Sequence, residues 1–183
     1  FSLEQNSLFE PYRFITAIFL HGGLLHLLFN LFALLFFGLI SENLIGSKKF
    51  FWFFIISGVF ANLVSFSFYP SSLGASGAIM GLIGLVAVLR PMMAVWAFGL
   101  ILPMFVVAII WIGASILGIF GIGENNIGYL AHLSGIFLGV LYGFVLRIRN
   151  KDKNAKFVIF KSSKKINIPE EHMRNWENFY LKK

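Results

Sequence analysis

Two residues of this sequence could act as a nucleophile and its base, and both lie inside apolar segments. Ser76 stands between Gly74 and Gly77, which let the backbone turn tightly and expose the hydroxyl, and His132 lies in a later apolar stretch. A serine hydroxyl becomes an effective nucleophile when a histidine within hydrogen-bond distance accepts its proton. The one aspartate, Asp152, lies in the basic C-terminal region. The sequence therefore predicts a serine–histidine dyad rather than a triad that includes an aspartate.

Each member of this pair also has a structural interpretation. Small residues such as Ser76 and Gly77 suit the close packing of membrane helices, and a buried histidine can hydrogen-bond to a neighbouring helix. Gly135 and Gly139 are four residues apart, so another helix can approach closely on the face that they share. His132 lies about one turn before Gly135 and should point toward that same neighbour.

A second group of polar residues could assist the pair. His26 and Asn30 are four residues apart and would project from one face of a helix. Histidine and asparagine side chains can donate hydrogen bonds to a developing oxyanion, although they also join helices to one another in membranes. A metal site is not expected, because the chain has no cysteine, no His-Glu-x-x-His motif and only scattered acidic residues. No cofactor is expected either.

The composition is that of an all-α, polytopic membrane protein. Of the 183 residues, 58% are hydrophobic and 13% are charged, whereas a soluble domain carries about 25% charged residues. A membrane span needs roughly 20 apolar residues, and segments of this kind recur along the whole chain. Five spans are predicted, in chain order 23–44, 50–68, 76–89, 92–117 and 128–146. The third is short for a span, so its start is expected to lie below the membrane surface.

Lysine and arginine indicate how these spans are oriented, because they gather on the cytoplasmic side of a membrane. Lys48, Lys49, Arg90 and the tail 147–183 should share that side. Alternation of the spans then places both members of the predicted dyad near external helix ends. The net charge of +7 comes mostly from the tail, and it indicates contact with a lipid bilayer and not with nucleic acid.

The predicted organisation has three parts. Residues 1–22 form an external interfacial loop, residues 23–146 form the transmembrane core, and residues 147–183 form a basic cytoplasmic tail. Arg13 is the lone basic residue on the external side, and Glu42 lies near the cytoplasmic end of the first span. Both are expected to be structural anchors.

Taken together, these residues resemble the rhomboid family of intramembrane serine proteases. The likeness runs in chain order over about residues 10 to 146, and the combination of motifs is specific although no single motif is. The matching elements are Tyr12-Arg13, His26-x-x-x-Asn30, Glu42 followed by Gly46, Gly74-Ala75-Ser76-Gly77, and Ala131-His132-Leu133-Ser134-Gly135.

The resemblance implies an intramembrane endopeptidase in which Ser76 is the nucleophile and His132 the general base. His26 and Asn30 would line the oxyanion hole with the backbone amide of Ser76. Many bacterial members of the family carry a tyrosine that stacks on the histidine at the position where this chain has Met80.

The resemblance also implies a six-helix bundle that cleaves transmembrane segments of other membrane proteins near their external end. Five spans are present and the chain begins inside what resembles the first external loop, so the family's first helix is expected to be missing. The expected location is the cell (inner) membrane, with the active site opening to the external side.

Two other functions fit parts of the sequence. A rhomboid-like protein that binds membrane clients without cutting them would be marked by loss of the serine or the histidine, and both are present. A transporter or channel fragment would show broken-helix repeats or paired ionisable groups across its spans, and the sequence shows neither.

Overall fold

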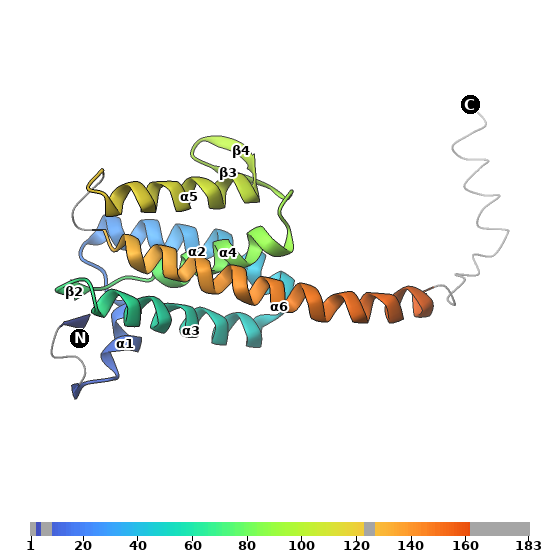
Figure 1. Ribbon diagram of the computed structural model, residues 1–183, viewed down its shortest axis with the longest axis horizontal. Helices are drawn as coiled ribbons and strands as arrows, with labels where there is room; N and C mark the ends of the chain where they lie inside the picture. Colours follow the sequence, from blue (N-terminus) through green and yellow to red (C-terminus); the bar gives the residue numbers. More distant parts are fainter. Residues whose placement is uncertain (1–2, 5–8, 123–126, 162–183) are drawn as a thin grey trace, which may run out of the picture. The chain divides into compact units, whose positions relative to one another are not determined.

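The computed structural model of the chain describes residues 3–4, 9–122 and 127–161, which are mostly helical (Figure 1). The helices are α1 (Arg13–Thr16), the 3₁₀ helix η2 (Ala17–Phe19), α2 (Leu24–Ile45), α3 (Ser47–Phe66), α4 (Ser76–Leu89), α5 (Met104–Ile119) and α6 (Tyr129–Lys161). The strands are β1 (Leu3–Glu4), β2 (Ser71–Ser72), β3 (Ala94–Ala97) and β4 (Leu100–Pro103). The chain divides into two compact units, Phe1–Arg147 and Ile148–Lys183.

Helix α4 is the central element of the first unit (Figure 1). It contacts α2, α3 and α5, and its glycines lie against α6. Nearly all of its residues are buried, and Leu82, Leu85 and Val86 are wholly enclosed. A helix that is apolar on every side belongs in a core or in a membrane, so the other helices of the first unit are arranged around α4.

The helices of the first unit alternate in direction. One end of the bundle holds the starts of α2, α4 and α6 and the ends of α3 and α5 (Figure 1). At the opposite end, α2 stops at Gly46, whose N–H donates to the Glu42 carbonyl oxygen at 2.7 Å. Gly46 has a φ of 84°, which glycine adopts without steric cost. The chain reverses there directly into α3.

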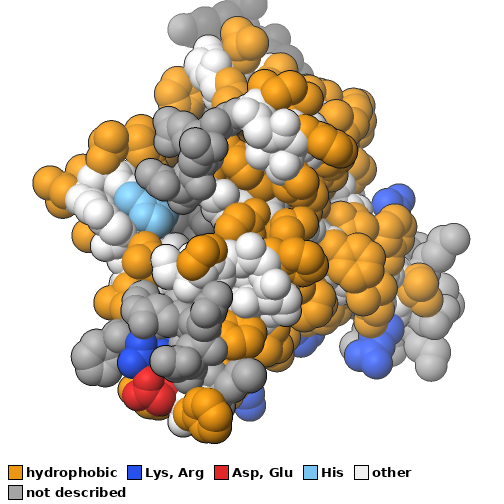
Figure 2. Space-filling model, turned by 60° about the vertical axis from the view of Figure 1, so that its left-hand side comes forward, with side chains coloured by type: hydrophobic (Ala, Val, Ile, Leu, Met, Phe, Trp, Pro, Cys, Tyr) orange, Lys and Arg blue, Asp and Glu red, His pale blue; other side chains and the backbone are white. Residues whose placement is uncertain are grey.

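Within the part of the chain that the structure describes, three helical segments are long and apolar enough to cross a membrane, namely α2, α3 and Tyr129–Arg149 of α6. Helices α4 and α5 have 14 and 16 residues, or roughly 21 and 24 Å at 1.5 Å per residue. Neither matches a hydrocarbon core of about 30 Å, so α4 cannot reach both membrane surfaces. Hydrophobic side chains cover most of the surface seen in Figure 2, with a histidine among them.

The predicted fourth span, 92–117, is wrong in its first half. Strands β3 and β4 pair antiparallel over residues 94–103, and α5 begins only at Met104. The turn residues Phe98 and Gly99 both have positive φ, 56° and 79°, which is the backbone that a two-residue hairpin requires. Hydropathy cannot separate an apolar strand from part of an apolar helix, and the hairpin therefore looked like the start of a span.

The predicted interfacial loop packs onto α3. The Asn62 side chain donates to the Phe14 carbonyl oxygen at 2.9 Å, in a buried position. The rings of Phe14 and Phe66 meet edge to face at 5.6 Å. Strand β1 pairs with β2, placing Leu3 opposite Ser72. The N-terminal region is thereby joined to the segment that precedes α4.

Helix α6 continues to Lys161, beyond the predicted end of the core at residue 146. Within the first unit, the Arg147 guanidinium donates to the Val88 carbonyl oxygen at the end of α4, at 3.4 Å. The rest of the predicted tail, residues 162–183, lies outside the described residues.

Candidate active site

Ser76 is the first residue of α4, and the loop before it passes beside α2. The Gly74 N–H donates to the Ala17 carbonyl oxygen at 2.8 Å. Gly74 has a φ of 114°, and a Cβ there would lie 2.9 Å from Cε1 of His26. Only glycine combines this backbone with so little bulk. Gly74 therefore lets the loop pass against His26 and begin the helix at Ser76.

The start of α4 also supplies hydrogen-bond donors. The first four N–H groups of an α-helix have no partner within the helix, and the helix dipole gives this end a partial positive charge. Ser76, Gly77 and Ala78 carry the first three of these groups. Such groups can stabilise a negative oxygen that forms beside the serine hydroxyl.

His132 lies in the first turn of α6. Tyr69, in the segment after α3, is hydrogen-bonded to this turn. The His132 N–H donates to the Gly128 carbonyl oxygen at 3.1 Å. The Leu130 N–H donates to the Tyr69 hydroxyl at 3.2 Å. The Tyr69 side chain thus satisfies one of the N–H groups at the start of α6, and it joins that start to the segment between α3 and β2.

The structure brings Ser76 and His132 together. Oγ of Ser76 and Nε2 of His132 are 2.9 Å apart, within the 2.6–3.2 Å range expected of a nucleophile and its base. His132 is 7% exposed, while Ser76 is half-buried. A neutral imidazole in this position can accept the hydroxyl proton while Oγ attacks a carbonyl carbon.

Glycines on both helices allow this approach. A Cβ at Gly135 would overlap the carbonyl oxygen of Gly77, and a Cβ at Gly139 would overlap that of Gly81. The backbones of α4 and α6 are therefore in direct contact, as small residues permit in membranes. The helix that lies beside Gly135 and Gly139 is α4, and this contact sets the register that brings Ser76 and His132 together.

His26 and Asn30 both lie on α2, and His26 contacts the loop that leads to Ser76. The Gly22 N–H approaches Nδ1 of His26 at 3.4 Å, so a neutral His26 carries its proton on Nε2. That nitrogen lies 3.0 Å from where a Cβ of Gly74 would stand. Asn30 is buried and uses one amide N–H for the His26 carbonyl oxygen at 2.8 Å. Two donor side chains thus come from α2.

Arg13 is paired within the N-terminal region. Its guanidinium contacts the Glu10 carboxylate at 2.6 Å, and the Tyr12 hydroxyl donates to the same carboxylate at 2.7 Å. The Tyr12 hydrogen bond and the Arg13 charge lower the pKa of Glu10. Glu42 lies toward the opposite end of α2 from His26, and no hydrogen bond to its carboxylate occurs among the described residues. Anchoring roles for Arg13 and Glu42 stay predictions.

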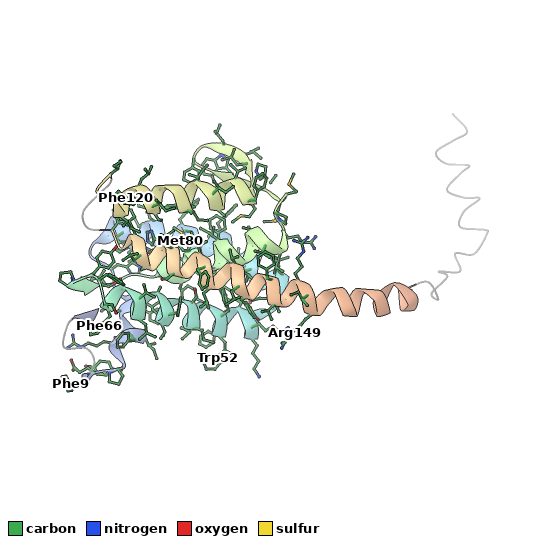
Figure 3. The ribbon with its side chains drawn as sticks, in the orientation of Figure 1. Phe9, Trp52, Phe66, Met80, Phe120 and Arg149 are labelled. Atoms are coloured by element: carbon green, nitrogen blue, oxygen red, sulfur yellow. The ribbon has the colours of Figure 1, made fainter. Side chains whose placement is uncertain are left out.

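Sequence reasoning missed two aromatic neighbours of His132. The rings of Trp111 and Tyr129 meet the imidazole edge to face, at centroid distances of 6.4 and 6.3 Å. Tyr129 precedes His132 by three residues, a spacing that shares a helix face and could have indicated the contact. Trp111 lies on α5, and no spacing in the sequence predicts its contact with His132. Met80 is 4% exposed inside the bundle (Figure 3).

Comparisons with known proteins match this architecture. The Rhomboid domain model matches residues 8–149. RHOMBOID-like protein 4 of Arabidopsis thaliana is 36% identical over 144 residues, covering 76% of this chain and 35% of that protein. Rhomboid protease GluP of Bacillus subtilis is 35% identical over 147 residues, covering 76% and 27%. Rhomboid protease GlpG of Salmonella paratyphi A is 32% identical over 138 residues, covering 75% and 49%.

The chain spans about half, or less, of the length of these curated relatives. The matched residues 8–149 include the bundle of apolar helices and the Ser76–His132 pair. Because this match covers well over half of the sequence, the chain belongs to the rhomboid family of membrane proteins, which includes intramembrane proteases.

Proposed function

We propose that this chain is an intramembrane serine endopeptidase that uses a Ser76–His132 dyad. The observation that carries the proposal is the 2.9 Å contact between Oγ of Ser76 and Nε2 of His132. The contact lies at the start of the most buried helix of the bundle, where unpaired N–H groups favour negative charge. An isolated structural serine would need neither the histidine nor this position.

The first half of the reaction forms an acyl-enzyme. The Ser76 hydroxyl proton moves to Nε2 of His132 as Oγ bonds to the substrate carbonyl carbon. The negative charge on the carbonyl oxygen is stabilised by the N–H groups at the start of α4 and by donors from His26 and Asn30. The C–N bond then breaks, and His132 returns its proton to the leaving amine.

The second half hydrolyses the ester. A water molecule gives its proton to Nε2 of His132 and attacks the acyl carbon. The C–Oγ bond breaks, Ser76 takes the proton back, and the new carboxyl terminus leaves. Water is absent from the hydrocarbon core, so the site must open to an aqueous surface.

The aqueous surface to which the site opens is the external one. The start of α3, with Lys48 and Lys49, and the end of α4, next to Arg90, lie at the end of the bundle opposite the start of α4 (Figure 1). Basic residues favour the cytoplasmic side. The substrates are transmembrane segments of other membrane proteins. Oγ can reach a peptide carbonyl only after the substrate helix unwinds, so segments with glycine or proline near their external end are the best substrates.

A serine-directed fluorophosphonate probe tests the proposal. The folded wild-type chain in detergent should be labelled, and Ser76→Ala should not. Ser134→Ala is the matched control, because its hydroxyl donates only to Ala131 in the same helix, at 2.9 Å, and it should be labelled normally. A folded wild-type protein that neither reacts with the probe nor cleaves a transmembrane reporter would favour the inert, client-binding alternative.

The oxyanion donors have a distinct kinetic signature. His26→Ala and Asn30→Ala should each lower kcat by about 10²–10³-fold and change KM much less, because these donors act mainly in the transition state. Cleavage kinetics on a reporter measure both constants. Wild-type turnover in both variants would remove them from the mechanism.

A further inference from the structure

The ring of Tyr129 lies between the catalytic histidine and the end of another helix. Tyr129 begins α6, and its ring meets the His132 imidazole at 6.3 Å with the planes 86° apart. This edge-to-face arrangement is the favourable one for aromatic pairs. The Tyr129 N–H donates to the Ile127 carbonyl oxygen at 3.0 Å. Tyr129 is therefore fixed at the first residue of α6, the helix that carries His132.

The other side of this ring rests on Gly118, in the last turn of α5. A Cβ at Gly118 would overlap three ring atoms of Tyr129, namely Cε1, Cζ and Cε2. No such contact exists at Gly113 of the same helix, where nothing lies within 4 Å of an added Cβ. Gly118, Tyr129 and His132 therefore form one continuous contact from α5 to the dyad.

Aromatic rings are the main groups available to orient the His132 imidazole within the described residues. Among the described residues, the hydrogen bond found for its side chain is the one to Ser76, and no carboxylate is paired with it. A carboxylate usually holds the imidazole of a serine hydrolase in place. Here the flanking groups are Trp111, at 6.4 Å, and Tyr129. Trp111 is a residue of α5, and the Tyr129 ring rests on Gly118 of the same helix.

We propose that Tyr129, seated on Gly118, is a positioning residue that keeps the His132 imidazole directed at Ser76. The proposal rests on the proposed protease function and adds a requirement to it, that the end of α5 must lie against the start of α6. The contacts of the Tyr129 ring are with the His132 imidazole and with Gly118, and not with the Ser76 hydroxyl. It acts by limiting rotation of the imidazole, and small misplacements of a catalytic group cost about 10²-fold in rate.

Single substitutions test each side of the contact. Gly118→Ala places a methyl group where the ring stands, so the ring must leave the imidazole. Tyr129→Ala removes the ring itself. Each should lower kcat for a transmembrane reporter by about 10–100-fold, with KM changed less than about twofold, because substrate binding is untouched. Tyr129→Phe keeps the ring and should retain most of the wild-type kcat. Gly113→Ala is the matched control and should behave as wild type.

The double variant separates positioning from general damage. In Tyr129→Ala the space over Gly118 is empty, so adding Gly118→Ala should lower kcat no further. Thermal unfolding in detergent, run in parallel, should give similar midpoints for Gly118→Ala and Gly113→Ala. Multiplying effects, or a loss of kcat explained by a lower midpoint, would overturn the positioning role.

The outcomes also distinguish this inference from the proposed function. If the wild type labels and cleaves while Tyr129→Ala keeps its kcat, the inference fails and the protease function stands. If neither the folded wild type nor any variant labels or cleaves, both fail together.

Discussion

Replacing Ser76 or His132 by alanine is expected to lower kcat by about 10⁴- to 10⁶-fold. The two atoms that would exchange the proton are 2.9 Å apart, and each variant removes one of them. Ser76 is the first residue of α4 and only half-buried, so Ser76→Ala should fold normally. The remaining N–H groups at the start of α4 cannot replace a nucleophile.

The double variant gives the sharper result. Residues that act as one unit have strongly non-additive effects, so Ser76→Ala with His132→Ala should be no slower than either single variant. Reporter cleavage in proteoliposomes measures the rates, and thermal unfolding checks the fold. Two independent losses that multiply, or a His132→Ala variant that keeps wild-type labelling, would contradict a dyad.

Gly139→Ala is expected to have the second-largest effect, on stability and activity together. The added Cβ would overlap the Gly81 carbonyl oxygen and lie 2.8 Å from the Leu85 nitrogen. Both are backbone atoms of α4, which is packed on several sides and cannot shift locally. Overpacking of this kind costs about 1–3 kcal/mol or more. Separating α6 from α4 would also lengthen the distance between the dyad atoms.

The measurement pairs a melting curve in detergent with fluorophosphonate labelling of the folded fraction. Gly113→Ala again serves as the control, because an added Cβ there meets nothing within 4 Å and alanine favours helix. We expect Gly139→Ala to melt several degrees lower and to label far more slowly. Normal labelling at an unchanged midpoint would show that the α4–α6 contact does not set the geometry of the dyad.

Much of the fold follows from hydropathy, because the bilayer restricts what an apolar segment can do. A segment in lipid must satisfy its backbone hydrogen bonds internally, so the runs around 23–44, 50–68 and 128–146 could hardly be other than helices. The same reasoning failed at 92–103. There the chain forms the β3–β4 hairpin, whose strands satisfy each other's backbone groups and leave no sign in hydropathy.

The residues of the candidate site were also predicted from the sequence, by their types and spacing. One serine flanked by glycines, one histidine in a late span and a His26–Asn30 pair at helical spacing are uncommon in apolar segments. Their residue types limit the chemistry to nucleophile, base and donor. The glycine spacing at 135 and 139 predicted that a second helix would come close.

Only the tertiary structure decided which groups touch. The 2.9 Å dyad contact joins residues 56 positions apart, and it depends on the register of α4 against α6, which a spacing within one helix cannot specify. The same holds for three other contacts, namely the hydrogen bond from the Leu130 N–H to the Tyr69 hydroxyl, the ring contact of Trp111 with His132, and the contact of the Tyr129 ring with Gly118. Sequence patterns report which face of a helix a residue occupies. The partner on that face is set by how several helices pack around α4, and that is a property of the whole bundle.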